Sequence, residues 1–279
     1  FYETFLGKYN PKLRKSRGVW YTPQPVVQFI VRAVDDLLKS EFGLSQGLAD
    51  TSKIKSKVDF HGKKVDKEFH RVQVLDPATG TGTFLAETIK HIYEENFKNI
   101  NEGIWPQYVE KDLIPRINGF ELLMASYSMA HLKLDMLLSE TGYETNQDQR
   151  FNIFLTNSLE EHHKDTGTLF ASWLSDESTL ANQIKRDTPV MCVIGNPPYS
   201  VSSSNKSEWI ENLLKDYKKN LNERNIQPLS DDYIKFIRFG QYFVDKNGEG
   251  ILAYISNNSF VDGIIHRQMR RSLLESFDK

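Results

Sequence analysis

Five short apolar segments alternate with amphipathic helical patterns along this chain. The apolar segments are 71–75, 117–121, 151–155, 190–194 and 250–256, with the sequences RVQVL, INGFE, FNIFL, VMCVI and GILAYIS. Such an alternation is typical of parallel strands joined by helical crossovers, because helices then cover both faces of the sheet. The sequence therefore predicts an α/β fold with a mainly parallel sheet.

The helical patterns and the polar segments predict the rest of the fold. Helices are expected over 25–39, 83–98, 122–139, 207–221, 231–245 and 264–276. Pro25 suits the first turn of the first helix, where an N–H group has no helical partner. Two polar segments, 44–70 and 201–232, look like insertions. We expect a surface excursion with a hairpin at His61-Gly62 in the first, and a functional loop beside a strand end in the second.

A glycine-rich turn, 76-DPATGTGTFL-85, follows the first predicted strand. Gly80 and Gly82 allow a tight turn and a close approach to a ligand, and the next helix offers free N–H groups at its start. Asp76 closes the strand and is expected to point into the same crevice. The turn lacks the lysine of a phosphate loop and departs from G-x-G-x-x-G, so a ligand without a pyrophosphate fits better. A plain strand-to-helix turn is the alternative.

The second predicted strand ends in an acid, Glu121. An acid at this position commonly accepts hydrogen bonds from ribose hydroxyls, which predicts a crevice built for a nucleoside. The alternative is an acid favoured at the start of a helix by the helix dipole.

The fourth predicted strand runs into Asn196, Pro197, Pro198 and Tyr199. Prolines cannot donate to a sheet, and they fix the backbone rigidly. An exocyclic amine on a base is a poor nucleophile, because its lone pair is delocalised into the ring. Two acceptors held against its N–H bonds, the Asn196 side chain and the Pro197 carbonyl, would favour a pyramidal nitrogen. Tyr199 offers a ring on which a base flipped out of its duplex can stack.

Composition narrows the class of protein. The net charge of −2 argues against a freestanding nucleic-acid binder, but not against an enzyme whose DNA-gripping parts lie elsewhere. Cys192 is the single cysteine and is interpreted as a buried small hydrophobe, so no disulfide framework is possible. There is no metal-ligand spacing, no apolar run long enough for a bilayer and no secretory leader. A cytoplasmic protein is therefore expected.

These motifs together resemble gamma-order DNA adenine-N6 methyltransferases, which use S-adenosylmethionine. The segment GVWYTPQPVV (18–27) resembles their first cofactor motif, DPATGTGTF the second, and NPPY the catalytic motif. The resemblance implies a Rossmann-like methyltransferase sheet and a methyl transfer to a flipped-out adenine. It also implies a set of cofactor-binding residues: Tyr21, Thr22, Asp76, Pro77, Gly80, Gly82, Glu121, Asn157 and Ser158. Asn157 matches the position that contacts the cofactor adenine, where the family often has Asp, and Thr22 is expected to cap the first helix.

The opening FYETFLGKYNPKLRKSRGVWYTP and the run INGFELLMASYSMAHLKL resemble the methyltransferase region of type ISP restriction-modification enzymes. That resemblance implies double-stranded DNA as a partner, together with nuclease, translocase and target-recognition domains of a larger polypeptide. Residues 1–279 are then a catalytic core, with an N-terminal helical lead over 1–40 and a surface insertion over 44–70. The C-terminal strands of the family sheet and a target-recognition domain are expected to be missing, so the fragment should methylate DNA poorly.

Several alternatives stay open. A protein glutamine-N5 methyltransferase also uses NPPY, because an amide nitrogen has the same delocalised lone pair, and a non-catalytic cofactor-binding module is a further possibility. Asp231 and Asp232 could line a substrate pocket or cap a helix. A basic cluster could contact phosphates or be simply solvated, and it consists of Lys12, Arg14, Lys15 and Arg17.

Overall fold

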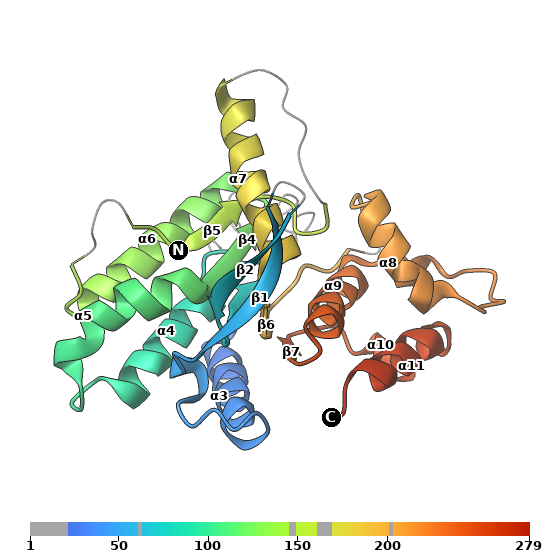
Figure 1. Ribbon diagram of the computed structural model, residues 1–279. Helices are drawn as coiled ribbons and strands as arrows, with labels where there is room; N and C mark the ends of the chain where they lie inside the picture. The colour runs from blue at the N-terminus through green and yellow to red at the C-terminus, as the bar shows by residue number, and fades with distance from the viewer. Residues whose placement is uncertain (1–21, 61–62, 145–148, 161–168, 201–202) are drawn as a thin grey trace.

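The centre of the protein is a parallel sheet (Figure 1). The computed structural model describes residues 22–60, 63–144, 149–160, 169–200 and 203–279. Its main sheet has five strands in the order β5-β4-β3-β6-β7, and each neighbouring pair is parallel. They are β3 (Val74–Asp76), β4 (Ile117–Glu121), β5 (Asn152–Leu155), β6 (Cys192–Gly195) and β7 (Ile251–Tyr254). All five strands predicted from the sequence are confirmed, with ends shifted by a few residues.

Helices cover both faces of this sheet. On one face lie α3 (Gln24–Ser40), α4 (Thr83–Asn96) and α6 (Met124–Glu140), and on the other α7 (Leu169–Asp187), α8 (Glu208–Lys218) and α9 (Asp232–Asn247). Successive strand residues point to opposite faces. In β6, Cys192 and Ile194 pack in the core of the first face and Val193 in that of the second. Burial on both faces explains why the strands are almost uniformly apolar.

The predicted helices are present, and the long helix α7 was not predicted, nor were the one-turn helices over 105–108 and 259–262. α7 joins β5 to β6, two parallel strands whose connection must cross back over the sheet. Its described part buries Ala181 and Ile184 against the sheet. The sequence around it carries several charged and small polar residues, so its apolar periodicity is weak. Topology, rather than local pattern, indicates this helix.

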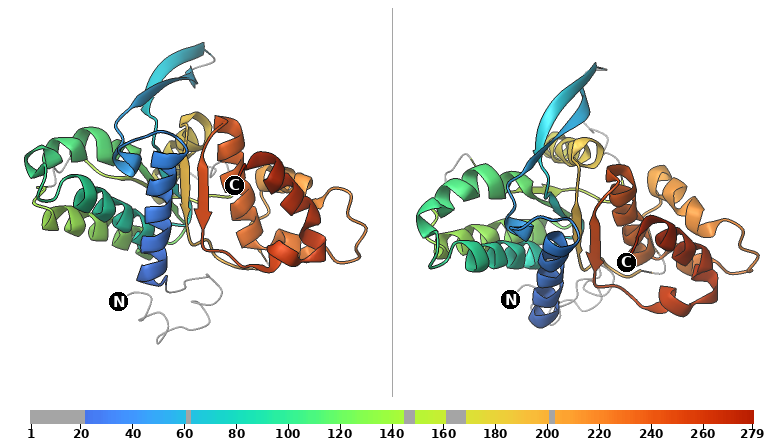
Figure 2. Two further views of the ribbon diagram at one scale, coloured as in Figure 1. Left: turned by 90° about the horizontal axis from the view of Figure 1, so that it is seen from below. Right: turned by 60° about the horizontal axis from the view of Figure 1, so that its bottom comes forward.

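The first polar insertion forms a β-hairpin that projects from the body of the protein (Figure 2). Strands β1 (Lys53–Phe60) and β2 (Lys63–His70) pair antiparallel. Lys55 lies opposite Glu68 and Lys57 opposite Asp66, so the charges on that side of the ribbon are matched across the strands. The turn predicted at 61–62 lies outside the described residues, but the strands on either side of it pair as a hairpin requires.

The short helices lie at opposite ends of the sheet (Figure 1). α5 (Trp105–Tyr108) lies near α4, where the Trp105 ring packs against Phe97. α10 (Ser259–Asp262) and α11 (Arg267–Ser276) follow β7, and Met269 of α11 packs with Leu214 of α8 and Ile237 of α9. Cys192 is buried with a free thiol, as expected. No helix in the part of the chain that the structure describes has the length and apolar character needed to cross a membrane.

One glycine sets how closely the glycine-rich turn packs on the sheet. A Cβ at Gly119 in β4 would lie 2.5 Å from Thr79 Oγ1 and 3.1 Å from Leu85 Cδ1. Thr79 cannot easily move away, because its hydroxyl donates to the Asp76 carbonyl at 2.9 Å and its N–H to the Phe120 carbonyl at 3.0 Å. The turn after β3 is therefore held directly against β4.

We expect Gly119→Ala to destabilise the protein by about 1–3 kcal/mol, because the added methyl overpacks this contact. The measurement is urea unfolding. The matched control is the same change in a Thr79→Ala background, where the colliding hydroxyl is gone and the added cost of the methyl should be clearly smaller. An equal cost in both backgrounds would show that Thr79 does not set the contact.

Candidate functional site

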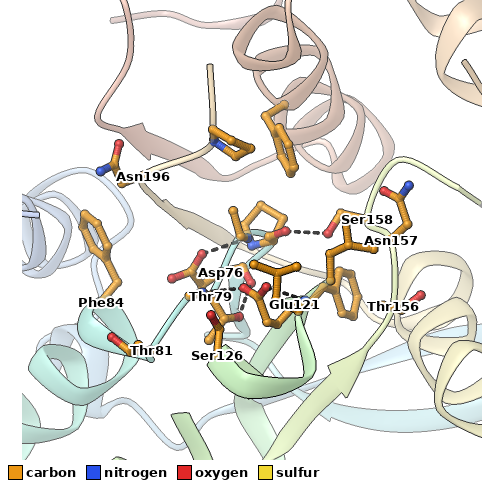
Figure 3. A pocket seen from close by; sticks show the side chains of 18 of the residues that line it. Asp76, Thr79, Thr81, Phe84, Glu121, Ser126, Thr156, Asn157, Ser158 and Asn196 are labelled. Atoms are coloured by element: carbon orange, nitrogen blue, oxygen red, sulfur yellow. Dashed lines mark hydrogen bonds between the residues drawn. The ribbon is translucent and has the colours of Figure 1, made fainter. Parts of the chain in front are cut away.

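A cavity lies at the carboxyl edge of the sheet, where four strands end side by side (Figure 3). In sheet order the strand ends supply Asn157 after β5, Glu121 at the end of β4, Asp76 at the end of β3 and Asn196 after β6. Predicted site residues line much of it: Thr22, Asp76, Pro77, Gly80, Glu121, Asn157, Ser158, Asn196 and Pro198. In open α/β sheets ligands bind in this crevice.

The glycine-rich turn forms the floor of the cavity and leads into α4. Gly80 and Gly82 have φ angles of +55° and +77°, in the left-handed region that favours glycine. Gly80 lines the cavity, whereas Gly82 lies at the start of α4, where a Cβ would approach Ala130 of α6 to 3.3 Å. The two glycines therefore have different roles. Gly80 faces the cavity, and Gly82 allows α4 and α6 to pack closely.

The carboxylate of Glu121 joins the two loops that border the cavity. One oxygen accepts from the Gly80 N–H and the other from the Leu123 N–H, both at 2.7 Å. The residue is only 8% exposed, and burial raises the pKa of its carboxyl to about 7 despite these hydrogen bonds. Each oxygen keeps a lone pair, so Glu121 can still accept hydrogen bonds from a ligand's hydroxyls.

Asp76 is the most deeply buried acid of the site. Burial raises the pKa of its carboxyl to about 8, with a smaller contribution from the nearby Glu121 charge, while a hydrogen bond from the Ala78 N–H at 3.0 Å opposes the shift. Gly195 of β6 makes room for it, since a Cβ there would lie 2.7 Å from Asp76 Oδ1. Two acids with raised pKa values thus face one cavity, which is a feature of functional sites.

The segment after β5 supplies two polar side chains. Ser158 Oγ donates to the Pro77 carbonyl at 2.5 Å, which fastens this segment to the turn after β3. Asn157 makes three hydrogen bonds within the protein: Nδ2 donates to Glu160 Oε1 and to Asn205 Oδ1, and Oδ1 accepts from the Leu159 N–H. Its amide is therefore held in one orientation at the β5 end of the cavity.

Asn196 stands at the opposite end of the cavity. Its Nδ2 donates to Thr22 Oγ1 at 3.1 Å, and its Oδ1 accepts from the Tyr199 hydroxyl at 3.3 Å. That hydroxyl also lies 3.3 Å from the Ile255 carbonyl, beyond the end of β7. Tyr199 and Pro197 are not among the residues that line this cavity. The amide of Asn196 therefore separates the cavity from the surface on which Tyr199 lies.

The expectation that Thr22 caps the first helix was wrong. The residue at the N-cap of α3 is Pro23, and no side chain caps this helix end. Proline occupies the first turn as predicted, and the Thr22 hydroxyl accepts the Asn196 hydrogen bond instead. Thr22 thus connects the start of α3 to the end of β6.

The structure confirms a helix cap at Asp231, and a substrate-pocket role for Asp231 or Asp232 stays a prediction. Asp231 is the N-cap of α9 and accepts from the Tyr233 N–H at 3.3 Å and the Ser200 N–H at 2.8 Å. Asp232 accepts from Ser203 Oγ and from Asn205 Nδ2. Neither acid lines the cavity, and together they fasten the loop after Tyr199 to α9.

Other site residues were not found from the sequence, or lie where the structure gives no description. Phe84, Phe120, Phe236 and Asn205 line the cavity without having been predicted. No local pattern marks them, because an aromatic residue in a helix or strand and a lone Asn in a serine-rich loop are common core and surface features. Predicted Tyr21 and the basic cluster at 12–17 lie outside the described residues.

The fold and cavity define an α/β protein with a polar crevice at the carboxyl ends of its parallel strands, and comparison with known proteins identifies its family. The model of the N-6 DNA methylase family matches residues 1–277. The chain therefore belongs to the N-6 DNA methylase family, and the resemblance drawn from its motifs is confirmed.

Individual relatives agree with this assignment. The chain is 24% identical to the Type II methyltransferase M.BstVI of Geobacillus stearothermophilus over 79% of its own length and 34% of the relative. It is similar to the type ISP restriction-modification enzyme LlaBIII bound to DNA, with a TM-score of 0.69, 28% identity, and coverage of 91% of this chain and 16% of that one. It is also similar to DrdV in a complex with DNA, with a TM-score of 0.70 and 29% identity. That match covers 99% of this chain and 24% of DrdV. The chain thus spans at most about a third of these proteins.

The two buried acids give the ligand-free protein a distinctive pH dependence. Their folded pKa values, about 8 for Asp76 and about 7 for Glu121, lie above their ordinary values of 3.8 and 4.5. The folded state therefore holds these protons while the unfolded state releases them, so their contribution to stability is present below about pH 4 and is lost as the pH rises towards 8.

We expect Asp76→Asn to become more stable relative to the unchanged protein as the pH rises from 5 to 8, because the variant has no proton to lose. Urea unfolding at the two pH values measures the difference. The control is Gln107→Ala at an exposed position, which removes no titratable group and should show a difference that hardly changes with pH. A pH-independent difference for Asp76→Asn would contradict the raised pKa.

Proposed function

We propose that this chain forms the cofactor-binding and catalytic core of an enzyme that transfers a methyl group from S-adenosylmethionine to N6 of adenine in DNA. The observation that carries the proposal is the arrangement of Asn196 and Glu121 on one cavity. Glu121 stands where an acid binds ribose hydroxyls, and Asn196 stands at the cavity's other end, where an acceptor can hold an amine. Membership of the N-6 DNA methylase family supports this choice over a glutamine amide as acceptor.

The order of the strands suggests how the proposed cofactor would lie along the edge of the sheet. Asn157, Glu121, Asp76 and Asn196 follow one another along the sheet edge. With the ribose at Glu121 and the transferable methyl group near Asn196, the nucleobase extends towards Asn157. The methionine part then lies near the glycine turn and Thr22, which also lines this cavity.

The chemistry assigned to Asn196 is positioning and electrostatic stabilisation. Its Oδ1 and the Pro197 carbonyl would accept hydrogen bonds from the two N–H groups of the adenine amine, and this would leave the nitrogen lone pair free for the methyl group that the cofactor would supply, with an amine proton passing to solvent. Positive charge develops on that nitrogen during attack, so two oxygen acceptors stabilise the transition state more than the ground state. Tyr199 would stack on the flipped base from the far side of Asn196.

The proposal includes a larger enzyme. LlaBIII and DrdV are described in complex with DNA, and each is far longer than this chain. We infer that the chain works as part of a restriction-modification polypeptide, on double-stranded DNA, with target recognition and nuclease functions in other parts of that polypeptide. Its modest net charge of −2 fits a core that relies on other parts for DNA affinity.

We expect Asn196→Ala in the full-length protein to lower the rate of methyl transfer to DNA by about 100-fold or more, as when a transition-state hydrogen bond is removed. Affinity for S-adenosylhomocysteine should change by less than about threefold, since the residue acts on the amine rather than on the cofactor. Transfer of labelled methyl groups and calorimetry measure the two quantities.

The exposed Asn225→Ala is the matched control and should methylate as the unchanged protein does. Label that enters protein and not DNA would favour the glutamine methyltransferase. Full methylation by Asn196→Ala would remove this residue from the mechanism.

Cofactor binding should depend on the ionisation of Glu121. Ribose hydroxyls donate to its carboxylate, so bound cofactor favours the charged form and lowers a pKa that is about 7 in the free protein. We expect the affinity for S-adenosylhomocysteine to strengthen between pH 6 and 7.5, and this slope to vanish in Glu121→Gln. The same slope in both proteins, measured by calorimetry, would place the titrating group elsewhere.

A further inference from the structure

The orientation of the Asn157 amide is fixed by partners whose roles are unambiguous. Nδ2 donates to the Glu160 carboxylate at 3.0 Å, which can only accept, and Oδ1 accepts at 3.0 Å from the Leu159 N–H, which can only donate. The second N–H of the amide goes to Asn205 Oδ1 at 2.8 Å. Both donors of Asn157 are therefore used inside the protein, and one lone pair on Oδ1 remains for a ligand.

The orientation of Asn205 is fixed in the same way, from the opposite side. Its Nδ2 donates to Asp232 Oδ1 at 3.0 Å, so its own Oδ1 must face Asn157. Asp232 is buried and also accepts from Ser203 Oγ at 2.5 Å. The charge of Asp232 thus sets the direction of a chain of hydrogen bonds that runs through Asn205 to Asn157.

A buried lysine holds this chain in place. Lys235 of α9 is 1% exposed, and its Nζ donates to Ser203 Oγ at 2.9 Å and to the Asn205 carbonyl. The loop that carries Asn205 is therefore bound to the first turn of α9 through both its backbone and its side chains. Asn205 cannot rotate its amide without breaking the bond to Asp232, and this makes it a rigid partner for Asn157.

We propose that Asp232, Asn205 and Glu160 are positioning residues that restrict Asn157 to the role of hydrogen-bond acceptor, so that the cavity selects a nucleobase with an exocyclic amine over one with a carbonyl at the same position. The proposal rests on the cofactor assignment above, which places the base at the β5 end. An adenine amine would donate to the free lone pair of Asn157 Oδ1. A hypoxanthine carbonyl would oppose that lone pair with another, and Asn157 has no N–H left to offer.

The arrangement also makes Asn157→Asp a damaging change, although the two residues have the same shape and both accept. An aspartate would place its second oxygen against the Glu160 carboxylate and against Asn205 Oδ1, where Asn157 now donates. Replacing Glu160 by Gln should correct the first of these two contacts, because the new amide can donate to the aspartate. This recovery of affinity would come from restoring a donor opposite an acceptor, because Glu and Gln have nearly the same shape and pack alike.

The test compares two ligands with the full-length protein: S-adenosylhomocysteine and its counterpart with hypoxanthine in place of adenine. Calorimetry gives both affinities. We expect the unchanged protein to bind the adenine ligand about tenfold or more tightly than the hypoxanthine ligand. Adenine makes one well-placed hydrogen bond to Asn157, whereas hypoxanthine brings two lone pairs into repulsion at the same place. In Glu160→Gln/Asn205→Ala the N–H of Asn157 that Asn205 accepted is released and can donate to a hypoxanthine carbonyl, while Oδ1 keeps its bond from the Leu159 N–H. The preference should then fall below about threefold.

A second pair of variants distinguishes a change in hydrogen bonding from a loss of folding. Thermal unfolding shows whether each variant is folded. Asn157→Asp should lose at least about tenfold in affinity for S-adenosylhomocysteine, and Asn157→Asp/Glu160→Gln should regain most of it. The inference is overturned if Glu160→Gln/Asn205→Ala prefers adenine as strongly as the unchanged protein does. It is also overturned if Asn157→Asp/Glu160→Gln recovers no affinity. Neither result would contradict the proposed function. Failure of the unchanged protein to bind S-adenosylhomocysteine overturns both.

Discussion

Parallel pairing of β3 with both β4 and β6 is the constraint on which the site depends. Because all five strands run in one direction, their carboxyl ends meet at one edge of the sheet. A glycine turn, an acid and an asparagine that lie far apart in the sequence are thereby brought to a single cavity. The contact of Thr79 with Gly119 and the two hydrogen bonds of Glu121 then fix the loops at this edge relative to each other.

The cavity has acids at its centre and neutral amides at its two ends. Near its centre two buried acids, Asp76 and Glu121, have no cation hydrogen-bonded to them among the described residues, and burial raises their pKa values. Such groups are costly in the ligand-free protein and favourable when a ligand donates hydrogen bonds to them. At the two ends stand neutral amides, Asn157 and Asn196, each oriented by neighbours. The cavity therefore combines acceptor oxygens of two acids at its centre, suited to hydroxyl groups, with amide oxygens at its ends, suited to amines.

Hydrogen bonds to the start of α9 connect these two ends. Ser200, next to Tyr199, donates to Asp231, while Asn205 donates to Asp232 and accepts from Asn157. The first residues of α9 thus contact both the chain beside the proposed substrate amine and the partner of the residue that is proposed to contact the cofactor base. This explains why a long polar segment beside a strand end carries buried hydrogen bonds rather than lying free on the surface.

The sequence predicted the elements whose signals are local, and missed those that depend on tertiary contacts. Apolar runs identified all five strands, and the residue types in DPATGTG and NPPY predicted which strand ends would meet. The helix α7 was missed because only the crossover between parallel strands requires it. Thr22 was assigned as a cap from its place before a helix, whereas its hydroxyl faces Asn196 across the fold. Asn205 and Phe236 carry no local signal, since their roles arise from loop and helix packing.

The central claim is that a nucleoside lies in this cavity with its ribose at Glu121. The most direct measurement is the affinity for S-adenosylhomocysteine and for its 2′,3′-dideoxy analogue, in the unchanged protein and in Glu121→Gln. We predict that loss of the hydroxyls weakens binding by about tenfold or more when the carboxylate is present, and much less when it is replaced. An equal loss in both proteins would contradict the claim.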